Sequence, residues 1–563
     1  MATYSTIPQG RTGLGLAAIL SFAAYFVFKR YEPSRPAPVC LLLIGIPVAI
    51  SLSTARSSDA LAAVPALCLV YWGSLAGLVL AYRISPFHPL ARYPGPFLCK
   101  LSKGSLAYVT ARTGRTYLYL HQLHQIHGDV VRIGPNELSI RHKDACVSVL
   151  GQKGIPRGPY YDPRIQDVDV ALDGIRDPAV HAIRRRPWAR AMNSASMKHY
   201  EDLICTTVTD LVNGLTKRLD EPIDIAIWMS FYGFDFMGRM AFTYEYGMLK
   251  EGRDTHGLRK MIDDALSEVR WISHVPWSVP LLKLTPGASK NWDTLKAAGA
   301  KVALHRASMA SIRPDLFHHL MDEEGHEAVK PNLEAVAVDG ALAIVAGADT
   351  AATTLAHFWY LMLRYPQYLG RLRGEIDAAF ALDDGPDFTK QANLPYLNAC
   401  LNETLRLLPP VLAGLQRRVE RGTGGKGVGP YFIPEDTQVT LVAYAIHRSS
   451  DAFSPLPETF WPDRWLAQEN YTLPGGETVP AGDVRTSREA FMPFSMGPMV
   501  CAGKNVALAE IRAVICAMVQ RFDVAVTDRV FLDKWEDELQ ECFVSKIGHL
   551  PVKVESRSAS APS

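Results

Sequence analysis

Residues 494–503 read FSMGPMVCAG and are followed by an apolar helical pattern from Lys504 to Phe522. A cysteine just before a helix receives unpaired backbone N–H groups and the positive end of the helix dipole, and both favour thiolate over thiol. A thiolate is a soft, anionic metal ligand. Gly497 and Gly503 allow the backbone to wrap closely around the sulfur of Cys501. The segment therefore predicts a metal-binding cysteine.

Other features of the chain support a special role for this one cysteine. Phe494, at the start of the segment, can cover one side of a flat cofactor. Cys400 and Cys516 lie inside apolar helical patterns, which is typical of buried structural cysteines. The nine cysteines are odd in number and show no paired CxxC spacing, so we expect a reducing compartment without a disulfide framework.

A second signal is the longest helical pattern, which runs from Pro331 to about Tyr365 and predicts a helix roughly 50 Å long. In its middle, residues 346–350 read AGADT, so small side chains leave a dent. Thr350 can donate back to the carbonyl of Ala346, which bends the helix and opens a groove. Asp349 beside that hydroxyl can move protons to a bound group. The alternative is a simple helix crossing with an aspartate that faces water.

A third signal combines a helix and a turn. Residues 403–406 read ETLR, which places Glu403 and Arg406 on one helix face. Such a pair on a surface contributes only about 0.2–0.5 kcal/mol and is a weak signal alone. Downstream, the aromatic turn FWPDRW at residues 460–465 supplies a second arginine, Arg464.

In this order and spacing, these elements resemble the haem-thiolate monooxygenases of the cytochrome P-450 superfamily, in particular the membrane-anchored, fungal-like microsomal type. The resemblance covers the chain from the Pro-rich linker to Pro551 and implies a mainly α fold with small β-sheets. It implies that Cys501 is the axial thiolate ligand of iron in haem b and that Asp349 and Thr350 are the catalytic proton relay. It further implies haem contacts by Ala346, Gly347, Phe494 and Gly503, and a structural ion-pair triad of Glu403, Arg406 and Arg464.

The resemblance also suggests how the haem propionates are held. The segment HAIRR, which begins at His181, matches the family helix whose first and fifth residues hold a propionate, and these are His181 and Arg185. Tryptophan is commoner at the first position. Arg418 matches another propionate partner. Met499 stands where the family usually has arginine or histidine, which places more of the propionate charge on the other three residues.

The first 85 residues differ in composition from the rest, because three stretches carry no charge: 12–28, 37–55 and 60–82. Only the third clearly reaches the roughly 20 residues that cross a bilayer. We expect an anchor of one to three transmembrane helices within residues 1–85. If all three stretches cross, the more basic first break and everything after residue 83 share the cytosolic side. The charges in the two breaks are Lys29, Arg30, Glu32, Arg35, Arg56 and Asp59.

The remaining chain predicts one large domain. Residues 86–99 form a Pro-rich linker, and residues 100–554 show long helical patterns broken by short strand-like runs, without internal repeats. The tail at residues 555–563 is rich in serine and alanine and is expected to be disordered.

Two histidine groups lie outside these motifs. His121, His124 and His127 recur every third residue, which spreads them around a helix and disfavours one shared ion. His318 and His319 are expected to face solvent.

These observations define a function and its alternatives. Lysine and arginine number 59 and aspartate and glutamate 57, so the charge gives no general attraction to nucleic acid. Only 62 residues follow Cys501, too few for a flavin domain, so electrons are expected from NADPH-cytochrome P-450 reductase, with cytochrome b5 as an optional donor. The expected activity is oxidation of a lipophilic small molecule, in secondary metabolism or xenobiotic oxidation, at the endoplasmic reticulum membrane on its cytosolic side. A haem-thiolate isomerase or dehydratase and a non-catalytic haem-binding protein are the alternatives.

Overall fold

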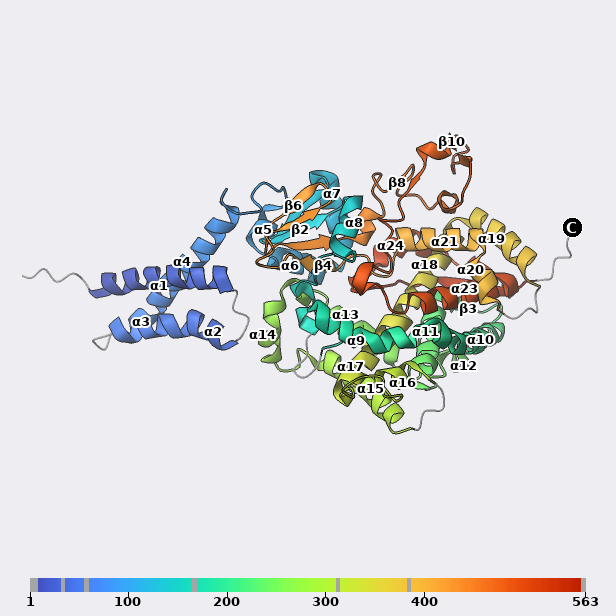
Figure 1. Ribbon diagram of the computed structural model, residues 1–563, viewed down its shortest axis with the longest axis horizontal. Helices are drawn as coiled ribbons and strands as arrows, with labels where there is room; N and C mark the ends of the chain where they lie inside the picture. The colour runs from blue at the N-terminus through green and yellow to red at the C-terminus, as the bar shows by residue number, and fades with distance from the viewer. Residues whose placement is uncertain are drawn as a thin grey trace, which may run out of the picture. The chain divides into compact units, whose positions relative to one another are not determined.

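The computed structural model describes residues 9–31, 36–54, 60–164, 170–309, 314–381 and 386–557 (Figure 1). The chain divides into two compact units. The smaller unit consists of Met1–Lys103, Arg132–Pro135 and Trp277–Thr285, and the larger unit holds the rest.

The small unit is helical. Its core buries Ala17, Ala24 and Tyr71, and the Tyr71 hydroxyl donates to the Leu42 carbonyl at 2.7 Å. Two segments are long and apolar enough to cross a membrane, Gly13–Tyr31 and Val64–Ile84, whereas Ala37–Ser53 is shorter. Its helices are α1 (Gln9–Tyr31), α2 (Pro36–Cys40), the π-helix η1 (Leu41–Gly45), α3 (Ile46–Thr54), α4 (Ala60–Ile84), α5 (Phe97–Leu101) and α14 (Val279–Lys283).

Two sequence expectations for this region meet the structure only in part. Lys29 and Arg30 lie in the last turn of α1, whereas the other charges of the two breaks, Glu32, Arg35, Arg56 and Asp59, lie outside the described residues. The predicted linker at residues 86–99 overlaps helix α5, which begins at Phe97. The helix can begin there because Pro96, its N-cap, is the last of the helix-breaking residues.

Helices dominate the large unit. Those that precede the central helix are α6 (Gly104–Thr113), α7 (Thr116–His127), α8 (Lys143–Leu150), α9 (Pro178–Ala191), α10 (Ser194–Thr216), α11 (Ile225–Phe242), α12 (Met248–Glu251), α13 (Leu258–Val269), α15 (Lys290–Ala307) and α16 (Leu316–Leu320). Those that follow it are α19 (Pro366–Ala379), α20 (Phe388–Ala392), α21 (Pro395–Leu407), α22 (Ala443–Ile446), α23 (Lys504–Arg521) and α24 (Arg529–Glu538). Short 3-10 turns are η2 (Pro159–Arg164), η3 (Ile272–His274), η4 (Pro276–Ser278), η6 (Pro462–Trp465), η7 (Ala481–Asp483) and η8 (Gly497–Met499).

The strands form small sheets. Strand β2 pairs in parallel with β7, with Leu138 opposite Val439, and β4 pairs antiparallel with β7, with Arg417 opposite Val439. The strands are β1 (Val130–Gly134), β2 (Glu137–Ile140), β3 (Pro222–Asp224), β4 (Leu415–Arg418), β5 (Lys426–Val428), β6 (Tyr431–Ile433), β7 (Gln438–Leu441), β8 (Phe453–Ser454), β9 (Asn470–Thr472), β10 (Thr478–Pro480), β11 (Arg485–Thr486), β12 (Phe522–Val526), β13 (Gln540–Cys542), β14 (Val544–Lys546) and β15 (Pro551–Ser556).

Strand β15 corrects the predicted start of the tail. It pairs with β12 so that Glu555 lies opposite Asp523 and Ser556 opposite Phe522. The Arg557 backbone N–H also donates to the Arg521 carbonyl at 2.9 Å. Regular structure therefore continues past residue 554, because the backbone ladder does not depend on the apolar content of the side chains. Residues 558–563 lie outside the described residues.

The predicted long helix is present, with an irregular middle. It consists of α17 (Leu333–Ile344), the π-helix η5 (Val345–Asp349) and α18 (Thr350–Arg364). Asn332 caps its start, since its side chain accepts from the Glu334 N–H at 3.1 Å. Helix α11 crosses it at backbone contact: a Cβ on Gly233 would lie 2.5 Å from the Ala348 carbonyl oxygen. Single π-turns of this kind often occur at functional sites.

Candidate active site

The segment before α23 forms a tight loop that presents Cys501. Gly497 has a φ of 66°, and a Cβ there would lie 2.3 Å from the Leu150 carbonyl oxygen, so only glycine fits. The loop closes on itself where the Cys501 N–H donates to the Phe494 carbonyl at 2.9 Å. Gly503 is different, because its φ of −83° is open to all residues and a Cβ there would meet no atom within 4 Å.

The surroundings of the Cys501 thiol act on it in two directions. Burial among protein atoms raises its pKa, although the residue remains accessible to water. The N–H groups of Gly503 and Lys504 and the charges of Arg185 and Lys504 lower it, and burial prevails. The helix start therefore acts in the expected direction, but burial outweighs it in the protein without metal. A coordinated metal ion would supply the missing stabilisation, since metal ions deprotonate their thiol ligands.

Behind the cysteine loop, Glu403, Arg406 and Arg464 meet as the sequence suggests. All three side chains are buried. Arg406 donates two hydrogen bonds of 2.8 Å to the Glu403 carboxylate, and Arg464 donates one of 3.1 Å. Two further donors had not been expected: the Trp461 backbone N–H at 2.9 Å and the Trp465 indole N–H at 2.8 Å. The aromatic turn at residues 460–465 was the available signal for both.

Burial alone would raise the pKa of Glu403, but Arg406, Arg464 and the hydrogen bonds hold it below its ordinary value. The carboxylate is thus ionised and saturated with donors, which suits a structural role and not proton transfer.

His447 connects this network to the cysteine loop. Its Nδ1 lies 3.0 Å from the Arg406 carbonyl, and its Nε2 accepts from the Met492 N–H at 3.1 Å. Burial lowers its pKa to about 3, so the ring stays neutral and keeps the lone pair that accepts from Met492. This residue, the C-cap of α22, could not be identified from the sequence, because a single histidine outside any motif carries no pattern.

A cluster of three arginines and one histidine lies near the cysteine. His181 and Arg185 come from α9, which begins with Asp177 as its N-cap. Burial, followed by the charges of Arg157, Arg185 and Arg417, lowers the pKa of His181 to about 4. Arg185 and the Cys501 thiol act electrostatically on each other. Such a concentration of positive charge is costly unless an anion joins it.

Arg418, which the resemblance assigns to a propionate, has a carboxylate partner within the chain. Its guanidinium pairs with the Asp436 carboxylate at 3.0 Å, whereas the adjacent Arg417 is buried and acts on His181. The cause is the alternation of side chains along β4, which turns consecutive residues to opposite faces of the strand. Arg157, which forms a bridge with Arg417 in the sheet, joins the same cluster without any sequence signal.

The central helix places Asp349 and Thr350 at its π-turn. The Thr350 hydroxyl donates to the Ala346 carbonyl at 2.6 Å, as expected from the sequence. Burial raises the pKa of Asp349 to about 7, with Asp263 of α13 raising it further and Arg259 opposing. Ala346 is exposed, whereas a Cβ on Gly347 would lie 2.3 Å from the Met237 sulfur of α11. Gly347 thus allows α11 to approach, and Asp349 is a carboxyl group that titrates near neutrality.

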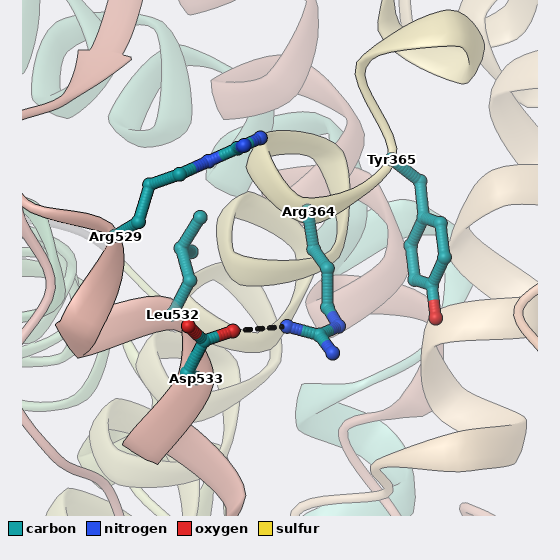
Figure 2. A pocket seen from close by; sticks show the side chains of 5 residues that line it. All are labelled: Arg364, Tyr365, Arg529, Leu532 and Asp533. Carbon is teal, nitrogen blue, oxygen red and sulfur yellow. Dashed lines mark hydrogen bonds and ion pairs between the residues drawn. The ribbon is translucent and has the colours of Figure 1, made fainter.

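A separate pocket of about 350 Å³ lies where α18 ends beside α24. Figure 2 shows Arg364 and Asp533 facing each other there, in an ion pair of 3.1 Å. Tyr365, Arg529 and Leu532 complete its lining, so none of the predicted site residues contributes to it.

The donor set fits a haem group. A thiol at a helix start offers a soft axial ligand for iron, and the arginine cluster at α9 and β4 offers cations for the propionate carboxylates. Met499, which cannot donate to a propionate, lies within η8. Arg157 and Arg417 add positive charge that the sequence assignment lacked.

Comparisons with known proteins agree with this arrangement. Residues 95–547 match the family described as Cytochrome P450. The chain is 31% identical to the cytochrome P450 monooxygenase phqL of Penicillium fellutanum over 86% of this chain and 83% of that protein. It is also 31% identical to tryprostatin B 6-hydroxylase of Aspergillus fumigatus over 90% of this chain and 87% of the relative. The crystal structure of the cytochrome P450DA heme domain shares its fold with a TM-score of 0.66 and 18% identity, over 83% of this chain and 98% of that one. The chain therefore belongs to the cytochrome P450 family and is a monooxygenase of the kind found in fungi.

Proposed function

We propose that this P450 monooxygenase binds haem b through Cys501 and hydroxylates a lipophilic small molecule of fungal secondary metabolism. The observation that supports oxygen activation most directly is the π-turn, where the Thr350 hydroxyl lies 2.6 Å from the Ala346 carbonyl beside a carboxyl group whose pKa is about 7. An isomerase or a haem carrier needs no such relay.

Each predicted residue has a role in this proposal. The Cys501 sulfur binds the iron, and His181, Arg185 and Arg417 donate to the propionates, with Arg417 taking the role first assigned to Arg418. Haem, when bound, supplies the activation of O2. The groups that flank it are Ala346, Gly347, Phe494 and Gly503, and the structural triad behind it is Glu403, Arg406 and Arg464.

Proton delivery is assigned to two side chains. The Asp349 carboxyl holds a proton below about pH 7 and exchanges it with water near α13, where Arg259 and Asp263 lie close enough to influence its pKa. The Thr350 hydroxyl, held by the Ala346 carbonyl, passes a proton onward by turning its own O–H.

The partners and location belong to the same proposal. Residues 1–85 anchor the chain in the endoplasmic reticulum membrane, residues 86–99 connect the anchor to the catalytic domain, and this domain faces the cytosol. Electrons come from NADPH-cytochrome P450 reductase, with cytochrome b5 as an optional donor. The apolar segments Gly13–Tyr31 and Val64–Ile84 support the anchor.

The first experiment tests the iron ligand. The full chain is produced in microsomes with the reductase, and the reduced protein is exposed to carbon monoxide. The wild type should show the absorption band of thiolate-ligated haem, and Cys501→Ala should lose it. Cys400→Ala is the matched control, because that cysteine is equally one of the free thiols but is buried within α21. A band that persists in Cys501→Ala would refute the ligand assignment.

The second experiment tests the activity. A panel of lipophilic compounds is screened for a shift of the haem absorption band, and each binder is incubated with and without O2 and NADPH. A hydroxylated product that requires both supports the proposal. Product formed without O2 and NADPH would identify the isomerase or dehydratase instead, and the absence of any binder would favour a haem carrier.

A further inference from the structure

A histidine- and glutamate-rich cluster lies far along the chain from the cysteine loop, at α16 and the turn that follows it. The three side chains His318, His319 and Glu324 each bring one ligand atom within 4.8 Å of the other two. Neither histidine is fully exposed, so the expectation that both face solvent is wrong. The turn at residues 321–327 folds back over α16, where the Glu323 N–H donates to the His318 carbonyl at 3.2 Å.

We propose that His318, His319 and Glu324 form a binding site for a divalent transition-metal ion, with Zn²⁺ as the preferred occupant. Two imidazole nitrogens and one carboxylate oxygen are a common ligand set for zinc, with a further position for water. Bonds of 2.0–2.2 Å in a tetrahedron separate the ligand atoms by about 3.3 Å. The His318 Nε2 and the Glu324 Oε1 already lie 3.4 Å apart.

A carboxylate holds the His318 ring, as is common for histidines that bind a metal ion. Its Nδ1 lies 2.8 Å from the Glu323 Oε2, which favours a proton on Nδ1 and a lone pair on Nε2. Glu323 is itself held by Arg306 at 3.2 Å. A carboxylate behind the ligating imidazole fixes the ring and raises its basicity.

His319 is the residue that favours a metal site over a simple cluster of ion pairs. Its Nε2 is buried, with no hydrogen-bond partner among the described residues. A buried nitrogen without a partner is unfavourable, whereas a metal ion would satisfy it. His318 and His326 alone would account for the ion pairs with Glu324, but they leave His319 unexplained.

The charges around the cluster are mixed. Asp322 accepts from the His326 N–H and the Glu327 N–H, both at 2.8 Å, which shapes the turn. Arg190 of α9 pairs with Asp322 at 3.4 Å and with Glu327 at 2.6 Å. A metal ion would therefore tie α16 to a turn that is already tied to α9.

The test measures zinc directly and needs no turnover. Full-length haem-loaded protein, prepared without a polyhistidine tag, is treated with EDTA and desalted, and Zn²⁺ is titrated in competition with a chromophoric chelator. The wild type should bind one equivalent, and Zn²⁺ should raise its unfolding temperature. His319→Gln and Glu324→Gln should weaken binding at least tenfold. Glu323→Gln should weaken it by about 10–100-fold, the usual effect of losing a carboxylate behind a ligating imidazole.

Two controls make the result decisive. His199→Gln removes an exposed histidine of α10 outside the cluster and should bind Zn²⁺ like the wild type. Haem content, measured for every variant, shows whether each one is folded. Wild-type protein that binds Zn²⁺ no more tightly than His319→Gln, or that gains no thermal stability from it, would overturn the proposal. A variant that fails to fold leaves the wild-type stoichiometry and thermal shift as the deciding measurements.

Discussion

Glu403 is the residue on which the structure behind the cysteine loop depends. Its carboxylate accepts five hydrogen bonds, two from Arg406 and one each from Arg464, Trp461 and Trp465. Glu403→Ala would leave two guanidinium groups buried without their shared partner, at a cost of about 3–5 kcal/mol. We expect little haem-loaded protein, measured as the ratio of haem absorbance to total protein. Glu334→Ala, at an exposed position of α17, is the control and should load haem normally. Normal loading of Glu403→Ala with slow turnover would argue for a catalytic role instead.

Thr350 contributes a hydroxyl to the relay but little to the fold. Thr350→Ala should keep haem content and the carbon monoxide band, because the lost hydrogen bond to Ala346 stays within one turn of the helix. Without the hydroxyl, reductant should be consumed with hydrogen peroxide released, and product formation should fall by roughly 10²–10⁴. Thr350→Ser, which keeps the donor, should restore most of the product. Reductant, peroxide and product are measured together, and unchanged coupling in Thr350→Ala would count against the relay.

Asp349 should give the reaction a pH dependence near neutrality. Its pKa is raised to about 7, chiefly by burial, so the carboxyl can donate a proton below this pH and has lost it above. Product formed per reductant consumed should therefore decline as pH rises from 6 to 8, with a midpoint near 7. The amide of Asp349→Asn cannot titrate, so the product formed per reductant consumed should be low in this variant and independent of pH. An identical profile in Asp349→Asn would exclude this group.

At the residue scale, the sequence predicted residues that belong to a recognisable motif. It did not predict residues whose role depends on the direction in which the side chain points. The ETLR motif and the aromatic turn led to Glu403 and Arg464, which meet in the structure. The choice between Arg417 and Arg418 depends on the phase of a four-residue strand, and composition does not reveal which of two adjacent arginines faces inward. The buried His447 and the orphaned nitrogen of His319 follow from tertiary packing, which brings distant segments together.

At the scale of elements, the contact between α11 and the central helix can be tested through glycine. A Cβ on Gly233 would collide with the Ala348 backbone, which cannot move aside as a flexible side chain could. Gly233→Ala should lower the free energy of unfolding by about 1–3 kcal/mol and disturb the π-turn. Gly370→Ala in α19 is the matched control, since a Cβ there meets nothing within 4 Å, and it should stabilise by up to about 1 kcal/mol. If Gly233→Ala and Gly370→Ala changed the unfolding temperature equally, α11 and the central helix would not be in close backbone contact.

The elements themselves were predicted to different degrees. The length of the central helix follows from its apolar period, and the helix ends at Arg364, two residues before a proline. The π-turn cannot be predicted from this period, because one extra residue in a helical turn leaves the apolar pattern almost unchanged. The sequence suggested a dent from the small residues at 346–350 and a Thr350 hydrogen bond, and both features coincide with the turn. The end of the last strand was missed because its final residues are charged and polar, while their pairing is made by the backbone.

At the scale of the whole molecule, composition separated the small helical unit from the catalytic one. It cannot distinguish a helix that crosses a bilayer from one that crosses a protein core. The segment Leu333–Arg364 is also long and apolar enough to span, yet half of its most apolar window is buried inside the structure. In the small unit that share is 28% for Gly13–Tyr31 and 22% for Val64–Ile84, so these helices present apolar surface that a bilayer would cover.

The number of membrane crossings in residues 1–85 can be counted by glycosylation mapping. Helix α1 has 23 residues and α4 has 25, or about 34 and 38 Å, and both exceed the roughly 30 Å of hydrocarbon. If the segment from α2 to α3 also crosses, residues 55–59 face the lumen and residues 32–35 the cytosol, on the side of Lys29 and Arg30. An Asn-X-Thr acceptor with a flexible spacer is inserted into each break, and the chain is expressed with microsomes. We expect glycosylation only at 55–59. Glycosylation at both positions would mean that the segment from α2 to α3 does not cross, because residues 32–35 and 55–59 would then lie together on the luminal side before α4 crosses to the cytosol.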